Sequence, residues 1–155
     1  MTEQISVANV MWGGLLAAVE TFIGRWRPND LRGELQFRND LFERLKSAVP
    51  SNAVVQKEYR HLGTTIDLWI QWKGFIFDTE FGLELKVNLT KKTDFDRLIG
   101  QIESMDPSIT KIIVVLIGRT DDSHIMKLRH RYSKHIYTGP GVEQTMAIVH
   151  VPVEA

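Results

Sequence analysis

Apolar residues return every three or four positions through the first third of the chain, which is the spacing of a helix buried on one side. Segment 5–26 follows this spacing, although the pair Gly13-Gly14 weakens the prediction. Segment 31–49 follows it more clearly, with polar residues on its other side, and Pro50 ends it. We therefore expect two helices before the first strand.

The pattern then changes to the alternation of apolar and polar residues that is typical of strands. Segments 54–60 and 64–72 alternate in this way on either side of a His61-Leu62-Gly63 turn. Lys73-Gly74 indicates a bend, after which segment 75–88 predicts a long third strand. The middle of the chain therefore predicts three consecutive strands.

The last third alternates between helix and strand. Helices are predicted over 93–105, where Thr93 or a neighbouring residue is the candidate N-cap, and over 121–135. Segment 111–118 is a continuous apolar run, as in strands buried on both faces, and 145–153 predicts a final strand. This order favours an α/β fold, a mixed central sheet flanked by helices on both sides.

Length, composition and charge limit the number of domains, the types of metal site and the binding partners that we expect. A chain of 155 residues suits one domain, and the absence of cysteine excludes disulfides and thiolate metal sites. No apolar run approaches the roughly 20 residues of a membrane helix, and no basic leader precedes an apolar stretch, so we expect a cytoplasmic protein without membrane contact. The formal net charge is zero, so any binding of nucleic acid must depend on local patches.

Ionisable groups interrupt one side of the second and third predicted strands. Because side chains alternate across a strand, Asp67 lies on one side of the second, and Glu84 and Lys86 lie together on one side of the third. The opposite sides of these two strands are apolar: Ile66, Leu68, Ile70, Leu83, Leu85 and Val87. Two carboxylates and a lysine on one face would suit a hard divalent cation that activates a water molecule.

The segments Gly63-Thr-Thr-Ile-Asp67 and Glu84-Leu-Lys86, with a helix before them and a helix and an apolar strand after them, resemble the PD-(D/E)XK nuclease superfamily. The resemblance covers 31–118 and implies a restriction endonuclease-like fold with an extra N-terminal helix. It implies that Asp67 and Glu84 bind Mg²⁺, for which Mn²⁺ could substitute, and that Lys86 assists the attacking water. The implied activity is endonucleolytic hydrolysis of DNA, or of RNA.

This resemblance divides the single domain, 1–155, into three parts. Residues 1–30 form an N-terminal helical extension, 31–118 the nuclease-like core, and 119–155 a C-terminal helix and strand. The N-terminal helix offers apolar surface for a homodimer, an arrangement that suits enzymes cutting two strands.

Many members of the superfamily add a glutamate from the first core helix. Glu34 shares the inward stripe of its helix, whereas Glu43 points nearly opposite, so Glu34 is the candidate. An ion pair with Arg38, four residues later, is the alternative role for Glu34. Some relatives place a polar residue on the next helix, where Gln101 matches; an ordinary surface glutamine is the alternative there.

The register of the third strand is the main difficulty. A tight hairpin at Lys73-Gly74 would place Asp67 opposite Glu80 instead of Glu84. A wider loop, or a bulge or break near Gly82, would bring Glu84 into position. We choose Glu84 because only Glu84 has the accompanying lysine, and Glu80 remains a possible extra ligand.

A second candidate feature is basic. Its members could contact nucleic-acid phosphates, although a charged helix is as often simply solvated: Lys91, Lys92, Lys127, Arg129, Arg131 and Lys134. With zero net charge and the uncertain register, the alternative function is a catalytically inactive, nuclease-like module for nucleic-acid binding or assembly.

Overall fold

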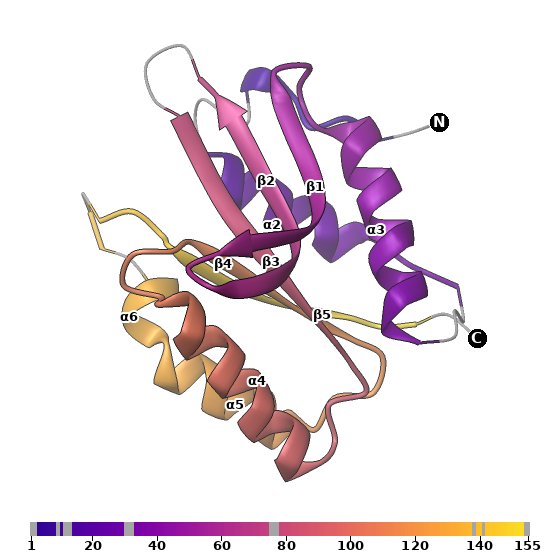
Figure 1. Ribbon diagram of the computed structural model, residues 1–155, viewed down its shortest axis with the longest axis vertical. Coiled ribbons are helices and arrows are strands. Elements are labelled where there is room, and N and C mark those ends of the chain that lie inside the picture. The colour runs from indigo at the N-terminus through magenta and orange to yellow at the C-terminus, as the bar shows by residue number, and fades with distance from the viewer. Residues whose placement is uncertain are drawn as a thin grey trace.

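The computed structural model describes residues 3–8, 10, 14–29, 33–74, 78–137, 139–140 and 142–153. Its helices are α2 (Leu15–Arg25), α3 (Glu34–Ala48), α4 (Lys92–Met105), α5 (Asp122–Arg131) and α6 (Ser133–Ile136). Its strands are β1 (Ala53–His61), β2 (Thr64–Lys73), β3 (Asp78–Val87), β4 (Ile112–Ile117) and β5 (Met146–Val151). The order of these elements confirms the α/β class (Figure 1).

The strands form a five-stranded sheet in the order β1-β2-β3-β4-β5. β1, β2 and β3 pair antiparallel, whereas β3, β4 and β5 pair parallel, so the sheet is mixed as expected. One apolar core lies between the sheet and α2 and α3, and a second lies on the side of α4, α5 and α6. Every residue of β4 is buried because both faces of this strand are covered.

The N-terminal segment differs from the prediction. Residues 3–6 are not helical, and α2 begins only at Leu15, after Gly14 with φ +85°. The expected single helix over 5–26 is therefore wrong, because Gly14 adopts a backbone conformation that a helix does not allow. The apolar side of α2, including Val19 and Ile23, is buried inside this chain's own core. The surface that suggested a homodimer contact is thus already covered, and the homodimer itself stays a prediction.

Three other boundaries also moved. α3 begins at Glu34 after Gly33, with φ +87°, while positions 31 and 75, where two elements were expected to start, lie outside the described residues. The N-cap of α4 is Lys91, and no side chain caps this helix, so the expected side-chain cap by Thr93 or a neighbour is wrong. The helix expected over 121–135 ends at Arg131 and restarts as α6 after Tyr132.

The β1–β2 hairpin bends sharply before its tip. β1 and β2 pair regularly except between Lys57↔Leu68 and Tyr59↔Ile66, where Glu58 has φ +53°. Pairing of β2 with β3 ends at the same level, at Leu68↔Leu83. Beyond this point the hairpin leaves β3 and turns across the sheet (Figure 1). Ile66 consequently joins the core beside α4, whereas Leu68 joins the core beside α3, so the expected shared side of Ile66 and Leu68 is wrong.

Gly82 allows the bent hairpin to lie close to β3. It sits in an unbroken ladder, paired with Trp69 on one side and Ile112 on the other, so the expected bulge or break is wrong. A Cβ at Gly82 would lie 2.9 Å from Cγ2 of Ile66 and 3.3 Å from the ring of Trp69. The glycine is therefore required by close approach of the hairpin and not by a bulge.

Candidate active site

The candidate site lies where β2 leaves β3, beyond the pair Leu68↔Leu83. We call this region the fork; it contains Asp67 of β2 and the segment Glu84-Leu85-Lys86 of β3. Gly82 donates its N–H toward β4, to the carbonyl of Lys111 at 3.0 Å, so by alternation the N–H of Leu85 points toward β2. No β2 backbone remains at that level, and the Asp67 carboxylate accepts this N–H instead, with Leu85 N to Asp67 Oδ2 at 2.9 Å. The unpaired edge of β3 thus fixes Asp67 directly against the Glu84-Leu85-Lys86 segment.

The connection between β2 and β3 settles the choice between the two glutamates. Lys73 pairs with Asp78, so the loop is wider than the tight hairpin considered from the sequence. Glu80 lies opposite Gln71, whose amide Nε2 donates to Glu80 Oε2 at 3.0 Å. Glu84 is the residue beside Asp67, and Glu80 is not available as an extra ligand at that position.

Asp67 and Glu84 form a buried carboxyl pair. Glu84 is 3% exposed, and its carboxyl group donates a hydrogen bond to the Asp67 carboxylate. Burial raises the pKa of Glu84 to about 9, and the neighbouring charge of Asp67 adds to this effect. Burial also raises the pKa of Asp67, opposed by the hydrogen bonds from Leu85 and Glu84. Near neutral pH the pair therefore shares one proton.

Glu34, in the first turn of α3, faces the same pair. Burial raises the pKa of Glu34, the Lys86 ammonium lowers it, and the charge of Asp67 raises it further. These effects place Glu34 within electrostatic reach of both β2 and β3. Lys86 is half-buried and also lowers the pKa of Asp67 and of Glu84. The structure thus brings Glu34, Asp67, Glu84 and Lys86 together.

Arg38 is a member of this cluster that the sequence analysis considered only as a partner for Glu34. Among the described residues, the ion pair of Arg38 is with Glu58 at the hairpin bend, Nη1 to Oε1 at 3.2 Å, and none joins it to Glu34. Its charge lowers the pKa of Asp67 and of Glu34, and its Nε is buried without a hydrogen-bond partner. The available signal was its position one turn after Glu34, on the same inward stripe.

Gln101 is not brought into this cluster by any recorded contact. It lies on α4, which covers the other core from α3. Its side-chain oxygen is buried without a partner, and across the described ranges no hydrogen bond joins its side chain to Glu34, Asp67, Glu84 or Lys86. A catalytic role for Gln101 therefore has no support from the contacts.

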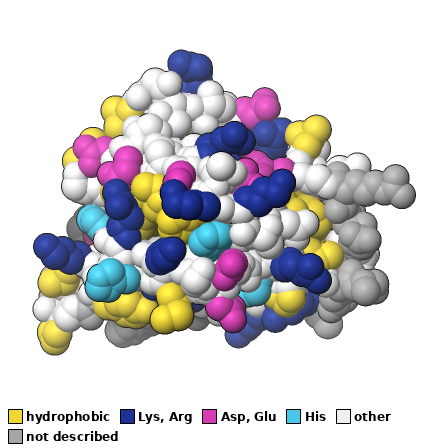
Figure 2. Space-filling model, turned by 90° about the horizontal axis from the view of Figure 1, so that it is seen from below, with side chains coloured by type: hydrophobic (Ala, Val, Ile, Leu, Met, Phe, Trp, Pro, Cys, Tyr) yellow, Lys and Arg dark blue, Asp and Glu magenta, His cyan; other side chains and the backbone are white. Residues whose placement is uncertain are grey.

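The basic residues do not form a continuous positive surface. Lys92 pairs with Asp96 at 2.8 Å, and Arg131 pairs with Glu103 at 3.1 Å. The guanidinium of Arg129 points to the carbonyl of Ile148, whereas the following side chains are exposed: Lys91, Lys127 and Lys134. Figure 2 shows basic side chains interspersed with acidic ones and histidines on the face seen from below. Nucleic-acid contact by these residues stays a prediction.

The donor set of the fork suits a hard divalent cation. Mg²⁺ usually takes one or two carboxylates and completes its coordination with water and substrate phosphate. Asp67 and Glu84 supply such a pair, since removal of the shared proton leaves two adjacent carboxylates. Within the described part of the chain, no group of three or more His, Cys, Asp and Glu side chains is arranged to hold a metal by itself. The carboxyl pair is therefore the candidate ligand set.

Comparison with known proteins identifies no family for the chain. No family model matches it, and no curated protein and no solved structure is detectably similar to it.

Among the described residues, no helix is long and apolar enough to cross a membrane.

Proposed function

We propose that the protein is a metal-dependent endonuclease that hydrolyses DNA phosphodiester bonds. The observation that carries this proposal is the convergence of Asp67, Glu84 and Lys86 in the fork, where the two carboxyl groups are close enough to share a proton. This arrangement agrees with the PD-(D/E)XK resemblance of the same residues. The mixed sheet with helices on both faces also accommodates that resemblance.

Each residue of the fork has a role in this proposal. Asp67 and Glu84 would hold the ion, and the Leu85 N–H keeps Asp67 in position. A bound divalent ion would supply Lewis-acid chemistry, which lowers the pKa of water and offsets the phosphate charge. The Lys86 ammonium orients the attacking water and stabilises the charge that develops on the phosphate. Arg38 balances the acidic cluster from α3.

In this proposal Glu34 is the proton acceptor of the reaction. A new bond forms between the water oxygen and phosphorus, the bond from phosphorus to the leaving sugar oxygen breaks, and the leaving oxygen takes a proton from solvent. Because burial raises the pKa of Glu34, its carboxylate is a better proton acceptor near neutral pH than an exposed glutamate. Glu34 therefore accepts the proton that the water loses.

The direct test is cleavage of DNA by two variants. Asp67→Ala and Lys86→Ala should each abolish Mg²⁺-dependent cleavage of a labelled oligonucleotide, while circular dichroism shows an intact fold. Lys73→Ala removes an exposed lysine at the end of β2 and should cleave like the wild type. Unchanged cleavage by either fork variant would remove that residue from the mechanism.

A specific observation also favours the second function, an inactive nuclease-like module for nucleic-acid binding or assembly. The shared proton already neutralises part of the carboxyl pair near neutral pH, and the chain has zero net charge. Calorimetric titration with Mg²⁺ or Mn²⁺ separates the two functions. The nuclease should bind the ion and lose that binding in Asp67→Ala, whereas an inactive module should give no binding heat with either protein.

A further inference from the structure

A cavity of about 310 Å³ lies beside the fork. It is lined by residues of α3, of the end of β3, and of the segments that follow β3, β4 and β5: Phe37, Val87, Asn88, Gly118, Arg119, Pro152 and Val153. Phe37 is one helical turn after Glu34, and Val87 directly follows Lys86. The cavity therefore adjoins α3 and the end of β3, the elements that carry Glu34 and Lys86, while Val87 and Lys86 themselves lie on opposite faces of β3. It also lies at the carboxyl ends of parallel strands, where open α/β sheets commonly bind ligands.

The rim of this cavity is built from two fixed loops. Asn88 follows β3 with φ +52°, and Gly118 follows β4 with φ +80°. The N–H of Arg119 donates to Asn88 Oδ1 at 2.9 Å, which ties the loops together. A Cβ at Gly118 would lie 2.5 Å from the same oxygen, so only glycine permits this contact. The tie holds the start of the Arg119 side chain at the mouth of the cavity.

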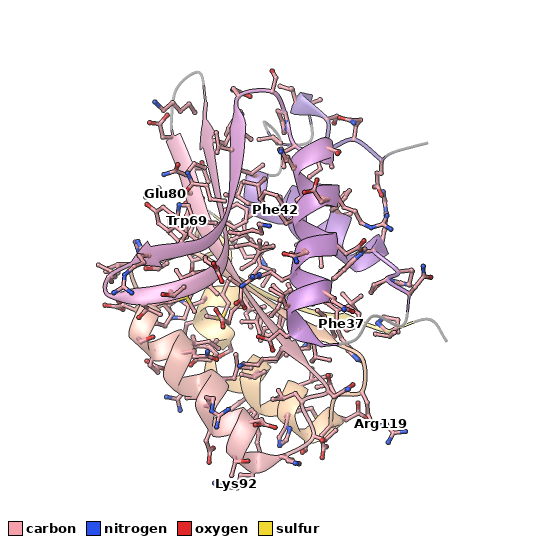
Figure 3. All side chains as sticks on the ribbon, turned by 45° about the vertical axis from the view of Figure 1, so that its right-hand side comes forward. Phe37, Phe42, Trp69, Glu80, Lys92 and Arg119 are labelled. Atoms are coloured by element: carbon pink, nitrogen blue, oxygen red, sulfur yellow. The ribbon has the colours of Figure 1, made fainter. Side chains whose placement is uncertain are left out.

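The lining combines apolar side chains with hydrogen-bond donors. Val87 and Val153 give an apolar floor that suits the face of a base, and Phe37, which is 2% exposed, supports this floor from beneath. The Asn88 side-chain amide and the Arg119 guanidinium offer hydrogen-bond donors at the edge, and Arg119 is suited to a phosphate. Over the described ranges the structure records no hydrogen bond or ion pair of this guanidinium. In Figure 3, Phe37 and Arg119 lie at the same end of the molecule.

We propose that this cavity takes one unpaired nucleotide of the DNA strand, next to the bond that the fork would cut. The position of the cut rests on the proposed function, whereas binding of the nucleotide does not. A base inside a duplex is stacked and paired, so its face is not available to an apolar floor. A volume near the low end of ligand pockets suits a single nucleotide unit. The protein should therefore prefer single-stranded or frayed DNA to a blunt duplex.

The test measures binding separately from cleavage. Fluorescence anisotropy follows a labelled single-stranded 12-mer and the matching blunt duplex, with Ca²⁺ in place of Mg²⁺. The wild type should bind the single strand about tenfold more tightly than the duplex, since removal of one base face from water contributes on this scale. Arg119→Ala, and Val153→Trp, which fills the cavity, should each lose this preference. Arg97→Ala removes an exposed arginine from α4, outside the lining, and should keep it.

The outcomes distinguish failure of the nucleotide site in the cavity from failure of the nuclease proposal at the fork. Asp67→Ala should lose cleavage and keep the single-strand preference. If Arg119→Ala and Val153→Trp melt like the wild type and keep the preference, the nucleotide site is overturned even if cleavage is observed. If both lose the preference but no protein cleaves DNA with Mg²⁺, the nucleotide site stands and the nuclease proposal fails. Equal binding of both DNAs by the wild type also overturns the site.

Discussion

Two glutamates on β3, Glu80 and Glu84, have opposite environments although they lie on the same side of the strand. Glu80 lies in the regular part of the β2–β3 ladder, is exposed, and accepts a hydrogen bond from Gln71. Glu84 lies four residues further on, in the fork, and is 3% exposed beside Asp67. Figure 3 shows Glu80 near Trp69, away from the end that carries Arg119.

The difference comes from the path of β2, not from the glutamates. Where β2 stays paired, its backbone satisfies β3, and the side chains on the ladder remain ordinary surface groups. Where β2 bends away at Asp67, a carboxylate replaces the missing backbone acceptor and is buried against a second carboxyl group. A change of strand direction can therefore create a buried carboxyl pair from residue types that remain exposed elsewhere on the same strand.

Exchange of each glutamate for glutamine gives the largest predicted contrast. Glu84→Gln should lower Mg²⁺-dependent cleavage by at least about 100-fold, because it removes a charged ligand from the site. Glu80→Gln should cleave like the wild type, since the hydrogen bond of its carboxylate is with Gln71 and not with a residue of the fork. Initial cleavage rates of a labelled oligonucleotide test both variants. Equal losses in the two variants would contradict the comparison.

The affinity for metal should depend on pH, because the ion competes with the shared proton of the fork. Because the pKa of Glu84 is raised to about 9, an ion must displace this proton at neutral pH. The affinity for Mn²⁺ should therefore rise by up to about tenfold between pH 7 and pH 8, measured by calorimetry. Glu80→Gln should keep this dependence, and Glu84→Gln should lose most of it. An affinity that is independent of pH would show that Glu84 is not a ligand.

Much of the regular part of the molecule follows from local patterns in the sequence. Periodicity predicted all five strands and their order, and the apolar run at 111–118 predicted a strand buried on both faces. Alternation along β3 placed Leu83, Leu85 and Val87 against one core. The proximity of Asp67 to Glu84 and Lys86 was expected from the same alternation and from the family resemblance.

The fork itself was not predictable because it depends on contacts between distant residues. A positive φ at Glu58 has no local signature, and the bend it allows is stabilised by Ile66 in the second core. A bulge or break near Gly82 was one of the alternatives drawn from the sequence, since close approach of the hairpin cannot be seen in the order of residues. Arg38 gave a periodicity signal, but its ion pair with Glu58 depends on the same bend.

Stability without metal should also distinguish the two glutamates. The folded state holds the Glu84 proton with a pKa of about 9, well above the ordinary value of 4.5. The folded state therefore binds this proton more tightly than the unfolded chain, and the free energy of unfolding falls as pH rises between these values. Glu84→Gln removes this fall and should be more stable than the wild type at pH 8 by roughly 1–3 kcal/mol. Urea unfolding in EDTA at pH 5 and pH 8 measures the difference, and Glu80→Gln should track the wild type at both.

The smallest predicted effect is on stability and concerns Gly82, which lies between Glu80 and Glu84 on β3. Gly82→Ala places a methyl group 2.9 Å from Ile66 Cγ2 and 3.3 Å from the Trp69 ring, and both side chains are fully buried. Neither can move freely, so the variant should lose about 1–2 kcal/mol of unfolding free energy. Gly100→Ala is the matched control, because its added Cβ meets nothing within 4 Å on α4 and should stabilise that helix by up to about 1 kcal/mol. Thermal unfolding of both variants measures the contrast. A Gly82→Ala variant as stable as Gly100→Ala would show that Ile66 and Trp69 do not pack closely against β3 at Gly82. Close packing of the hairpin on Gly82 would then not be what positions the fork.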